Sequence, residues 1–174
     1  MIEDAYAALE TVRLRADEFG INPEKIGVVG SSAGGHLAAH CLVAWRDYAS
    51  PVSLRPAFGI LCYPVIHLEK PYHHGGSARN LLGESPTPEA MAETRILDRI
   101  SSETPPCFIW HTVGDGSVPV ENSLHLASAL RAHDVPFDLH IYQRPGHGLG
   151  RKSALGWTQD CLRWLRDLSE GRPW

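Results

Sequence analysis

Residues 25–40, KIGVVGSSAGGHLAAH, constrain the fold of this chain more than any other stretch. A short apolar run that is rich in β-branched residues, 25–30, is typical of a buried strand. Gly30 and Gly34 then bracket Ser32, and an alanine-rich run that is typical of a helix follows. The stretch therefore predicts a sharp strand-to-helix turn with a serine at its tip. The alternative is a plain glycine-rich turn in which the serine only caps the helix.

The rest of the chain repeats this alternation of strand and helix. Apolar runs predict three more strands, at 57–63, 106–112 and 137–142. Apolar residues at helical spacing predict helices at 2–19, 33–47, 120–133 and 154–168. Alternating strands and helices form βαβ units, so we expect an α/β fold with a mostly parallel sheet of about four strands, flanked by helices. A length of 174 residues suits a single domain, 1–174.

The segment 64–105 breaks this rhythm. It contains many prolines and glycines and one predicted short helix, with Thr87 as its N-cap and Pro88 in its first turn. A long irregular segment between core strands is usually functional. We therefore expect 64–105 to be a lid-like insertion over a site.

Charge and composition exclude several classes of protein. Sixteen basic and twenty acidic residues give a net charge of −4 with no basic block, so nucleic acid is not an expected partner. No apolar run is long enough to span a bilayer, so no membrane partner is expected. The acidic, amphipathic N-terminus is not a signal peptide. Four cysteines lie inside apolar segments, as free buried thiols do: Cys41, Cys62, Cys107 and Cys161. Together these features predict a cytoplasmic protein.

Ser32 has candidate partners in the order that a nucleophilic serine requires. A serine nucleophile needs a general base, and the base needs an acid that orients it. Asp115 lies in a glycine-bracketed loop just after the third predicted strand, and His147 lies between two glycines after the fourth. Because the carboxyl ends of parallel strands meet at one edge of a sheet, we expect the three side chains to converge. The backbone N–H of Ala33 would then face the developing oxyanion.

Five other histidines are candidates for functional roles. His36 and His40 share a helical face at a spacing that can bind metal, but no third ligand has an evident place beside them, so no metal or cofactor is expected. His111 lies inside a predicted strand and reads as a packed core histidine. His73 and His74 resemble an oxyanion-loop signature, but they follow the nucleophile instead of preceding it. We expect them to line a substrate pocket.

Taken together, these motifs resemble the α/β-hydrolase superfamily. Within it they are similar to the acetyl-esterase-like group, which is related to acetylxylan and feruloyl esterases and akin to the prolyl oligopeptidase family. The resemblance rests on INPEKIGVVGSSAGGHLAAH, CYPVI, GSARNLLG, TPPCFIWHTVGDGSVPVENSLHLASAL and HIYQRPGHGLG. It implies that Ser32 is the nucleophile, Asp115 the acid, His147 the base and Ala33 one oxyanion donor. The implied activity is hydrolysis of small-molecule carboxylic esters with small acyl groups, without a cofactor. A peptidase or amidase of the same fold stays open.

The N-terminal side of Ser32 departs from this family. Its members have several strands and a glycine-rich oxyanion loop before the segment that matches here, so this chain resembles the C-terminal part of a member. A missing oxyanion donor would cost about 10²–10³ in rate, so a weakly active or inactive fragment is a further alternative. The strand at 25–30 would also be left as an exposed apolar edge. We therefore expect a homo-oligomer that covers this edge.

Overall fold

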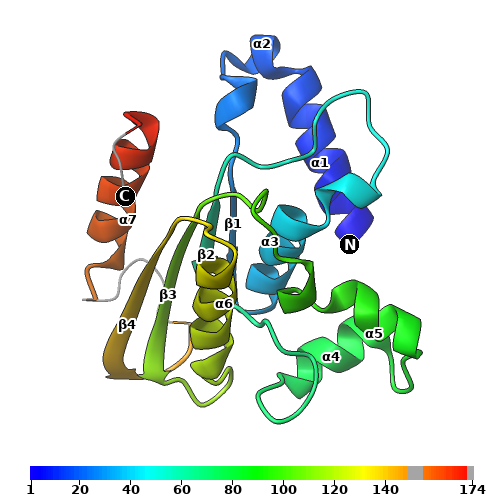
Figure 1. The fold of residues 1–174 in the computed structure, drawn as a ribbon, viewed down its shortest axis with the longest axis vertical. Helices are drawn as coiled ribbons and strands as arrows, with labels where there is room; N and C mark the ends of the chain where they lie inside the picture. Colours follow the sequence, from blue (N-terminus) through cyan, green and yellow to red (C-terminus); the bar gives the residue numbers. More distant parts are fainter. Residues whose placement is uncertain (149–154, 172–174) are drawn as a thin grey trace.

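The computed structural model describes residues 1–148 and 155–171, and it confirms the predicted α/β fold. One parallel sheet runs in the order β1-β2-β3-β4 (Figure 1), with the strands Val28–Ser31, Gly59–Cys62, Cys107–Gly114 and Phe137–Pro145. The first residues of neighbouring strands pair with one another, Val28 with Gly59, Gly59 with Cys107 and Cys107 with Phe137. The segments that follow the strands therefore start along one edge of the sheet, where the predicted site residues lie.

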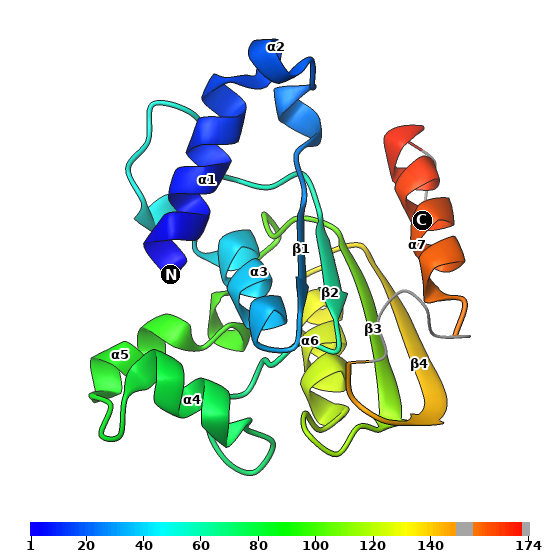
Figure 2. The ribbon, with the colours of Figure 1, turned by 180° about the vertical axis from the view of Figure 1, so that it is seen from behind.

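Helices cover both faces of this sheet, as Figures 1 and 2 show from opposite sides. On one face lie α3 (Ala33–Val43) and α6 (Glu121–Ala132), with α1 (Ile2–Leu14) packed outside α3. On the other face lies α7 (Trp157–Ser169). The remaining short elements are α2 (Ala16–Phe19), η1 (Pro23–Lys25), η2 (Trp45–Asp47), α4 (Gly75–Leu82), α5 (Pro88–Thr94) and η3 (Leu97–Arg99).

Alternation along β3 divides the core into two layers. Ile109 belongs to the cluster that includes Leu126 of α6, whereas Phe108 and Trp110 belong to the cluster that includes Trp164 of α7. Because side chains alternate between the faces of a strand, His111 lies on the same face as Ile109. This places the His111 imidazole under α6, four residues before Asp115.

The exposed edge that the sequence predicts is present at β1. Among the described residues β1 pairs only with β2, and the Val29 side chain is 69 % exposed. Edge strands of this kind offer unpaired backbone groups to another chain.

Several local predictions differ from the structure. The helix predicted over 2–19 is interrupted at Arg15, where φ is −107° and ψ is 18°, and Phe19 is 46 % exposed beneath the Arg15 guanidinium instead of facing the core. Gly20 ends the second piece in the left-handed conformation, as expected. Thr87 caps α5 as expected, because its Oγ1 accepts a hydrogen bond from Ala90 N–H. The α4 helix was not predicted, and residue 154, the predicted start of the last helix, lies outside the described residues.

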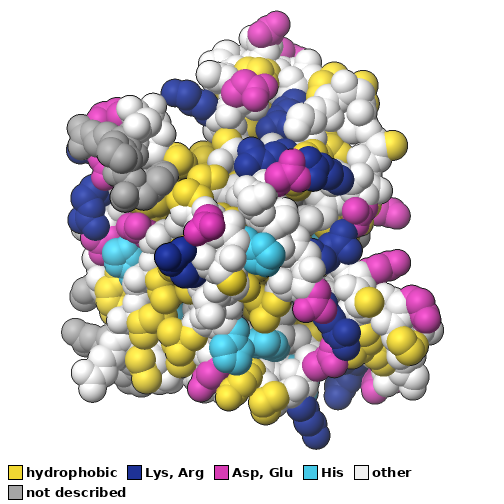
Figure 3. All heavy atoms as spheres, in the orientation of Figure 1, with side chains coloured by type: hydrophobic (Ala, Val, Ile, Leu, Met, Phe, Trp, Pro, Cys, Tyr) yellow, Lys and Arg dark blue, Asp and Glu magenta, His cyan; other side chains and the backbone are white. Residues whose placement is uncertain are grey.

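Surface and cysteine chemistry agree with the composition. Lys and Arg side chains are interspersed with Asp and Glu over the face drawn in Figure 3. All four cysteines are free thiols in the interior, as predicted. None of the helices within the described ranges combines the length and apolar character that a bilayer crossing needs.

Candidate active site

The turn after β1 holds Ser32 in a conformation that few residues adopt. Its φ is 55° and its ψ is −124°, which places a non-glycine residue in a strained region. A Cβ at Gly30 would lie 2.0 Å from the Gly34 carbonyl oxygen, and one at Gly35 would lie 2.7 Å from Cα of Pro64. Both positions therefore require glycine, whereas a Cβ at Gly34 would meet open space. The predicted sharp strand-to-helix turn is present, and close backbone packing explains two of its glycines.

Backbone hydrogen bonds hold this turn in place. Ser32 N–H donates to the Cys62 carbonyl at 3.0 Å, and the Ser32 carbonyl accepts from Val65 N–H, also at 3.0 Å. Ala33 begins α3, so its N–H belongs to the first turn, where no earlier helical carbonyl is available as a partner. The turn thus presents both a fixed hydroxyl and a helix N-terminus that favours negative charge.

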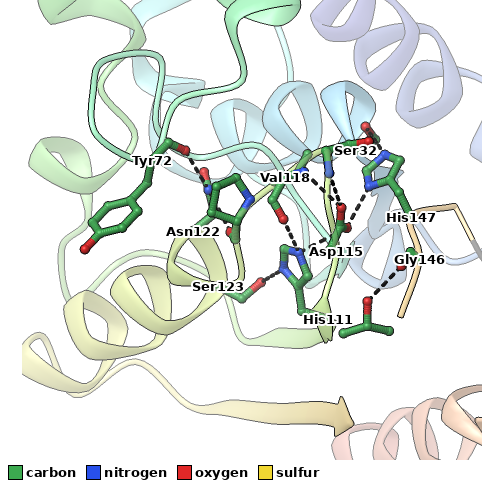
Figure 4. A network of polar contacts seen from close by, with 12 residues as sticks. Ser32, Tyr72, His111, Asp115, Val118, Asn122, Ser123, Gly146 and His147 are labelled. Atoms are coloured by element: carbon green, nitrogen blue, oxygen red, sulfur yellow. Dashed lines mark hydrogen bonds and ion pairs between the residues drawn. The ribbon is translucent and has the colours of Figure 1, made fainter. Parts of the chain in front are cut away.

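Three side chains from three strand ends form one continuous chain of contacts, drawn in Figure 4. His147 Nε2 lies 2.8 Å from Ser32 Oγ, and His147 Nδ1 lies 2.7 Å from Asp115 Oδ2. A carboxylate accepts only, so Nδ1 carries the proton and Nε2 can accept the serine proton. The His147 side chain is 24 % exposed and the Asp115 carboxylate is fully buried, so a substrate can reach the imidazole but not the acid.

The loop after β3 keeps Asp115 ionised. Burial by itself raises the pKa of the Asp115 carboxyl. Hydrogen bonds from Val118 N–H, His147 and Ser117 N–H lower this pKa by a larger amount, so the net pKa lies below the ordinary value. The two backbone donors both reach Oδ1 at 2.9 Å. Oδ2 is thereby left to face His147, as an orienting acid must.

The loops that carry Asp115 and His147 are tied directly to each other. Gly146 N–H donates to the Gly114 carbonyl at 3.2 Å, and Thr112 Oγ1 donates to the Gly146 carbonyl at 2.8 Å. Gly146 directly precedes the base, His147, and Gly114 directly precedes the acid, Asp115. These bonds fix the distance between the two loops without using either functional side chain.

The Tyr63 ring packs against the His147 imidazole. The two rings meet edge to face, with 4.9 Å between the ring centroids, and the Tyr63 ring packs against Trp110 in the same way at 4.8 Å. Tyr63 also has a positive φ of 38°, which is rare for an aromatic residue. Tyr63 lies in the CYPVI motif, immediately after the second strand, but it was not predicted as a site residue.

Asn122 links the insertion to the first turn of α6. Its Oδ1 accepts from the N–H groups of Ile66 and His67, each at 2.8 Å, and its Nδ2 donates to the carbonyls of Tyr72 and Pro119, each at 2.9 Å (Figure 4). The side chain is fully buried and its four hydrogen bonds satisfy both ends of the amide. Sequence reasoning missed it, because these partners lie up to 56 residues away.

His73 and His74, the predicted pocket residues, lie at the start of α4. His74 Nδ1 accepts from Ser77 N–H at 3.1 Å, so His74 is the N-cap of this helix. His73 Nδ1 is buried and has no hydrogen-bond partner among the described residues. Their contact with a substrate stays a prediction.

A small cavity lies next to the serine turn. It has a volume of about 240 Å³ and is bordered by the start of α3 and by α4; its lining includes Ala33, Gly34, Leu37, Leu68 and Leu81. Most of the lining is apolar. Such a cavity beside an oxyanion donor can receive a small organic group.

His36 and His40, which share a helical face at a spacing that can bind metal, each have a partner within the protein. His36 Nδ1 lies 3.1 Å from the Val65 carbonyl oxygen, and His40 Nδ1 lies 3.3 Å from the Tyr6 hydroxyl. Burial lowers the pKa of His36 to about 4, and burial together with the neighbouring His36 lowers that of His40 to about 4. Among the described residues no group of three His, Cys, Asp or Glu side chains is placed to hold a metal ion.

These two histidines predict a loss of stability in acid. Both are neutral when folded and would bind protons near the ordinary pKa of 6.5 once unfolded. The unfolded chain therefore binds more protons between about pH 6.5 and 4, and the free energy of unfolding falls as the pH falls through this window. Each shift corresponds to about 3 kcal/mol, present above pH 6.5 and lost progressively below it.

Urea unfolding at pH 7.5, 5.5 and 4.5 measures this effect. His40→Gln removes one of the two groups and is expected to flatten the dependence on pH, whereas the same change at the exposed His133 should leave the slope as it is. An unfolding free energy that does not change between pH 7.5 and 4.5 would contradict the assignment of both histidines as buried and neutral.

Comparison with known proteins identifies the family of this chain. The sequence profile of the prolyl oligopeptidase family matches residues 2–172. The chain belongs to the prolyl oligopeptidase family. Among solved structures, the acetyl ester-xyloside bifunctional hydrolase from Caldicellulosiruptor lactoaceticus is 42 % identical in sequence to this chain, and the two structures superpose with a TM-score of 0.90. The match covers 97 % of this chain and 65 % of that one. The α/β-hydrolase fold expected from the motifs is thereby confirmed.

Two curated proteins, a xylanase and an acetylxylan esterase by name, are similar to this family member. It is 39 % identical over 155 residues to endo-1,4-beta-xylanase B of Butyrivibrio fibrisolvens, a match that covers 85 % of this chain and 24 % of that protein. It is 31 % identical over 179 residues to an acetylxylan esterase of Xylanibacter ruminicola, which covers 96 % and 35 % respectively. The chain thus spans about a quarter to a third of the length of these relatives.

Proposed function

We propose that this chain is a serine hydrolase that cleaves carboxylic esters of small acyl groups through an acyl-enzyme. One observation carries the proposal: the hydroxyl, imidazole and carboxylate of Ser32, His147 and Asp115 form one hydrogen-bonded chain with contacts of 2.8 and 2.7 Å. Unrelated folds reach the same arrangement for acyl transfer, so geometry and roles identify it.

In the proposed reaction Ser32 Oγ attacks the ester carbonyl while His147 Nε2 takes its proton. The oxyanion faces the N–H of Ala33 at the start of α3, and Asp115 stabilises the imidazolium. His147 then gives the proton to the leaving alcohol, which leaves an acyl group on Ser32. Water, activated by the same imidazole, releases the acid and restores the hydroxyl. Every proton removed is returned, so the cycle needs no cofactor.

The preference for small acyl groups rests on the relatives and on the size of the site. Two of the similar proteins carry acetyl ester or acetylxylan in their names. The cavity beside Ala33 is only about 240 Å³. Assay with 4-nitrophenyl acetate and 4-nitrophenyl octanoate tests this: the acetate should be the better substrate by kcat/KM, and no hydrolysis of either would contradict the proposal.

A peptidase or amidase activity is the second candidate, because the matching profile carries the name of a peptidase family. An ester and an anilide of the same acyl group separate the two. Faster turnover of the ester is the expected result, and comparable turnover of acetyl anilides would favour the alternative. Failure of both substrates would point to the third reading, a weakly active or inactive fragment.

We further propose that residues 1–174 act as one domain in which 64–105 serves as a lid. Support comes from α4, which borders the cavity beside Ala33, and from Asn122, which anchors the start of the insertion. His73 and His74 lie within this segment and are proposed to contact the alcohol part of the substrate. The free thiols fit the proposed cytoplasmic location.

The open edge of β1 supports the proposal of a homo-oligomer. Val29 lies on a shallow apolar groove that is also lined by Ile60, Trp157, Cys161 and Leu162. A charged side chain introduced into an edge strand opposes its pairing with another chain. The wild-type protein is expected to sediment as a dimer or larger species, and Val29→Lys as a single chain of 19.2 kDa.

The matched control is Leu124→Lys, which adds the same charge at an exposed leucine of α6. This variant should keep the wild-type sedimentation coefficient. A wild-type protein that sediments as a folded monomer at all concentrations would contradict the proposed oligomer.

A further inference from the structure

A second imidazole, which is buried, lies against the candidate acid and faces the same carboxylate oxygen, Asp115 Oδ2, as His147. His111 has no exposed surface, and its Nε2 lies 3.0 Å from the Val118 carbonyl oxygen and 3.4 Å from Asp115 Oδ2. Its Nδ1 lies 2.8 Å from Ser123 Oγ in the first turn of α6. Figure 4 shows the ring between these partners. Both ring nitrogens therefore have a hydrogen-bond partner, and these partners connect the ring to the Asp115 loop and to α6.

The partners decide which nitrogen carries the proton. A backbone carbonyl and an ionised carboxylate can only accept, so the two neighbours of Nε2 require an N–H there. Burial lowers the pKa of His111, which keeps the ring neutral with one proton. Nδ1 is then a lone pair, and the Ser123 hydroxyl must donate to it. A serine on α6 thus supports the tautomer that the acceptors around Nε2 require of a histidine on β3.

The tautomer matters because Val118 faces both groups. Val118 N–H donates to Asp115 Oδ1, and the Val118 carbonyl accepts from His111. In the opposite tautomer the Nε2 lone pair would lie against two acceptor oxygens, Val118 O and Asp115 Oδ2. Repulsion there would push the 115–118 loop outward, and the carboxylate would lose its alignment with His147.

We propose that His111 and Ser123 are positioning residues, which hold the Asp115 loop so that its carboxylate stays aligned with the His147 imidazole. This inference rests on the proposed function, because Asp115 must orient a working base. Neither residue touches the reacting atoms, so both act through Asp115. Small displacements of a catalytic group cost large factors in rate, about 10²-fold for 1 Å.

A matched pair of substitutions tests the role of the Nε2 proton. His111→Gln places an amide N–H near the position of Nε2 and can still donate to Val118, whereas His111→Asn ends near Nδ1 and cannot. We expect kcat for 4-nitrophenyl acetate to fall less than about tenfold in the glutamine variant and about a hundredfold in the asparagine variant, with KM nearly unchanged in both. Equal activities of the two variants would overturn the inference.

The serine is tested in the same way. Ser123→Ala removes the donor and should lower kcat about tenfold or more, and Ser123→Thr, which keeps the hydroxyl, should restore most of it. Thr104→Val is the control for losing a buried hydroxyl elsewhere, since Thr104 Oγ1 accepts a hydrogen bond from Ser101 N–H in the loop before β3. The control should lower stability and leave kcat unchanged. If Ser123→Ala behaved like this control, the role of Ser123 would be structural only.

A spectroscopic measurement on the wild type avoids any variant that could fail to fold. Long-range ¹H–¹⁵N correlation spectra of the protein with ¹⁵N-labelled histidine should show the Nε2–H tautomer for His111. An Nδ1–H tautomer in the wild type would overturn the inference. Labelling of the wild type by a fluorophosphonate separates the two claims: without labelling the proposed function fails, whereas labelling at equal rates in wild type and Ser123→Ala refutes only the positioning role.

Discussion

Replacement of Ser32 by alanine is expected to reduce ester hydrolysis by about 10⁴-fold or more, to the level of the uncatalysed reaction plus binding effects. The reason is that Ser32 Oγ is the only hydroxyl within hydrogen-bond distance of His147 Nε2 among the described residues. Initial rates with 4-nitrophenyl acetate at a fixed protein concentration measure the loss. KM carries little information here, because residual turnover in the variant would not pass through an acyl-enzyme.

Two further variants sharpen this result. Ser31→Ala removes the neighbouring, exposed serine at the end of β1 and should keep the wild-type rate. Asp115→Asn preserves the shape of the acid but removes its charge, so a drop of about 10⁴-fold is expected. Comparable activity of Ser32→Ala and the wild type would show that another group performs the hydrolysis.

The second large effect is on folding. Asn122→Ala is expected to lower the free energy of unfolding by about 3–5 kcal/mol. The change leaves two N–H groups, of Ile66 and His67, and two carbonyls, of Tyr72 and Pro119, without their side-chain partner. It also leaves a space at a site with no exposed surface. Urea unfolding followed by circular dichroism gives the difference.

Asn80→Ala is the matched control, because the same side chain is removed from an exposed position on α4. Its expected effect is below about 0.5 kcal/mol. Asn122→Asp keeps the acceptor oxygen but loses the donor and buries a charge, so it should be no more stable than the alanine variant. An Asn122→Ala protein as stable as Asn80→Ala would mean that the amide does not anchor the insertion.

The sequence was sufficient for the features that depend on chain order. The three residues of the proposed site each follow an apolar run, and parallel strands bring such positions to one edge whatever lies between them. The exposed edge at Val29 followed from the family resemblance, because members of that family have further strands before the segment that matches here. The free cysteines followed from their apolar surroundings.

Contacts between distant segments could not be predicted in this way. Asn122 and Ser123 read as ordinary first-turn residues of a helix, and only the fold brings them to the insertion and to His111. The α4 helix was missed because a histidine, His74, caps it in place of the usual serine, threonine or aspartate. His111 was correctly predicted to be buried, but the prediction of simple packing overlooked its contacts with Val118 and Ser123.

Reaction with a fluorophosphonate probe, followed by mass spectrometry of the tryptic peptides, tests the central claim most directly. The probe reports on an activated serine whatever the natural ester is. The account predicts a single adduct on Ser32, with labelling lost in Ser32→Ala and strongly slowed in Asp115→Asn. Intact protein that takes up no probe, or that carries the adduct on Ser31 or another serine, would contradict it.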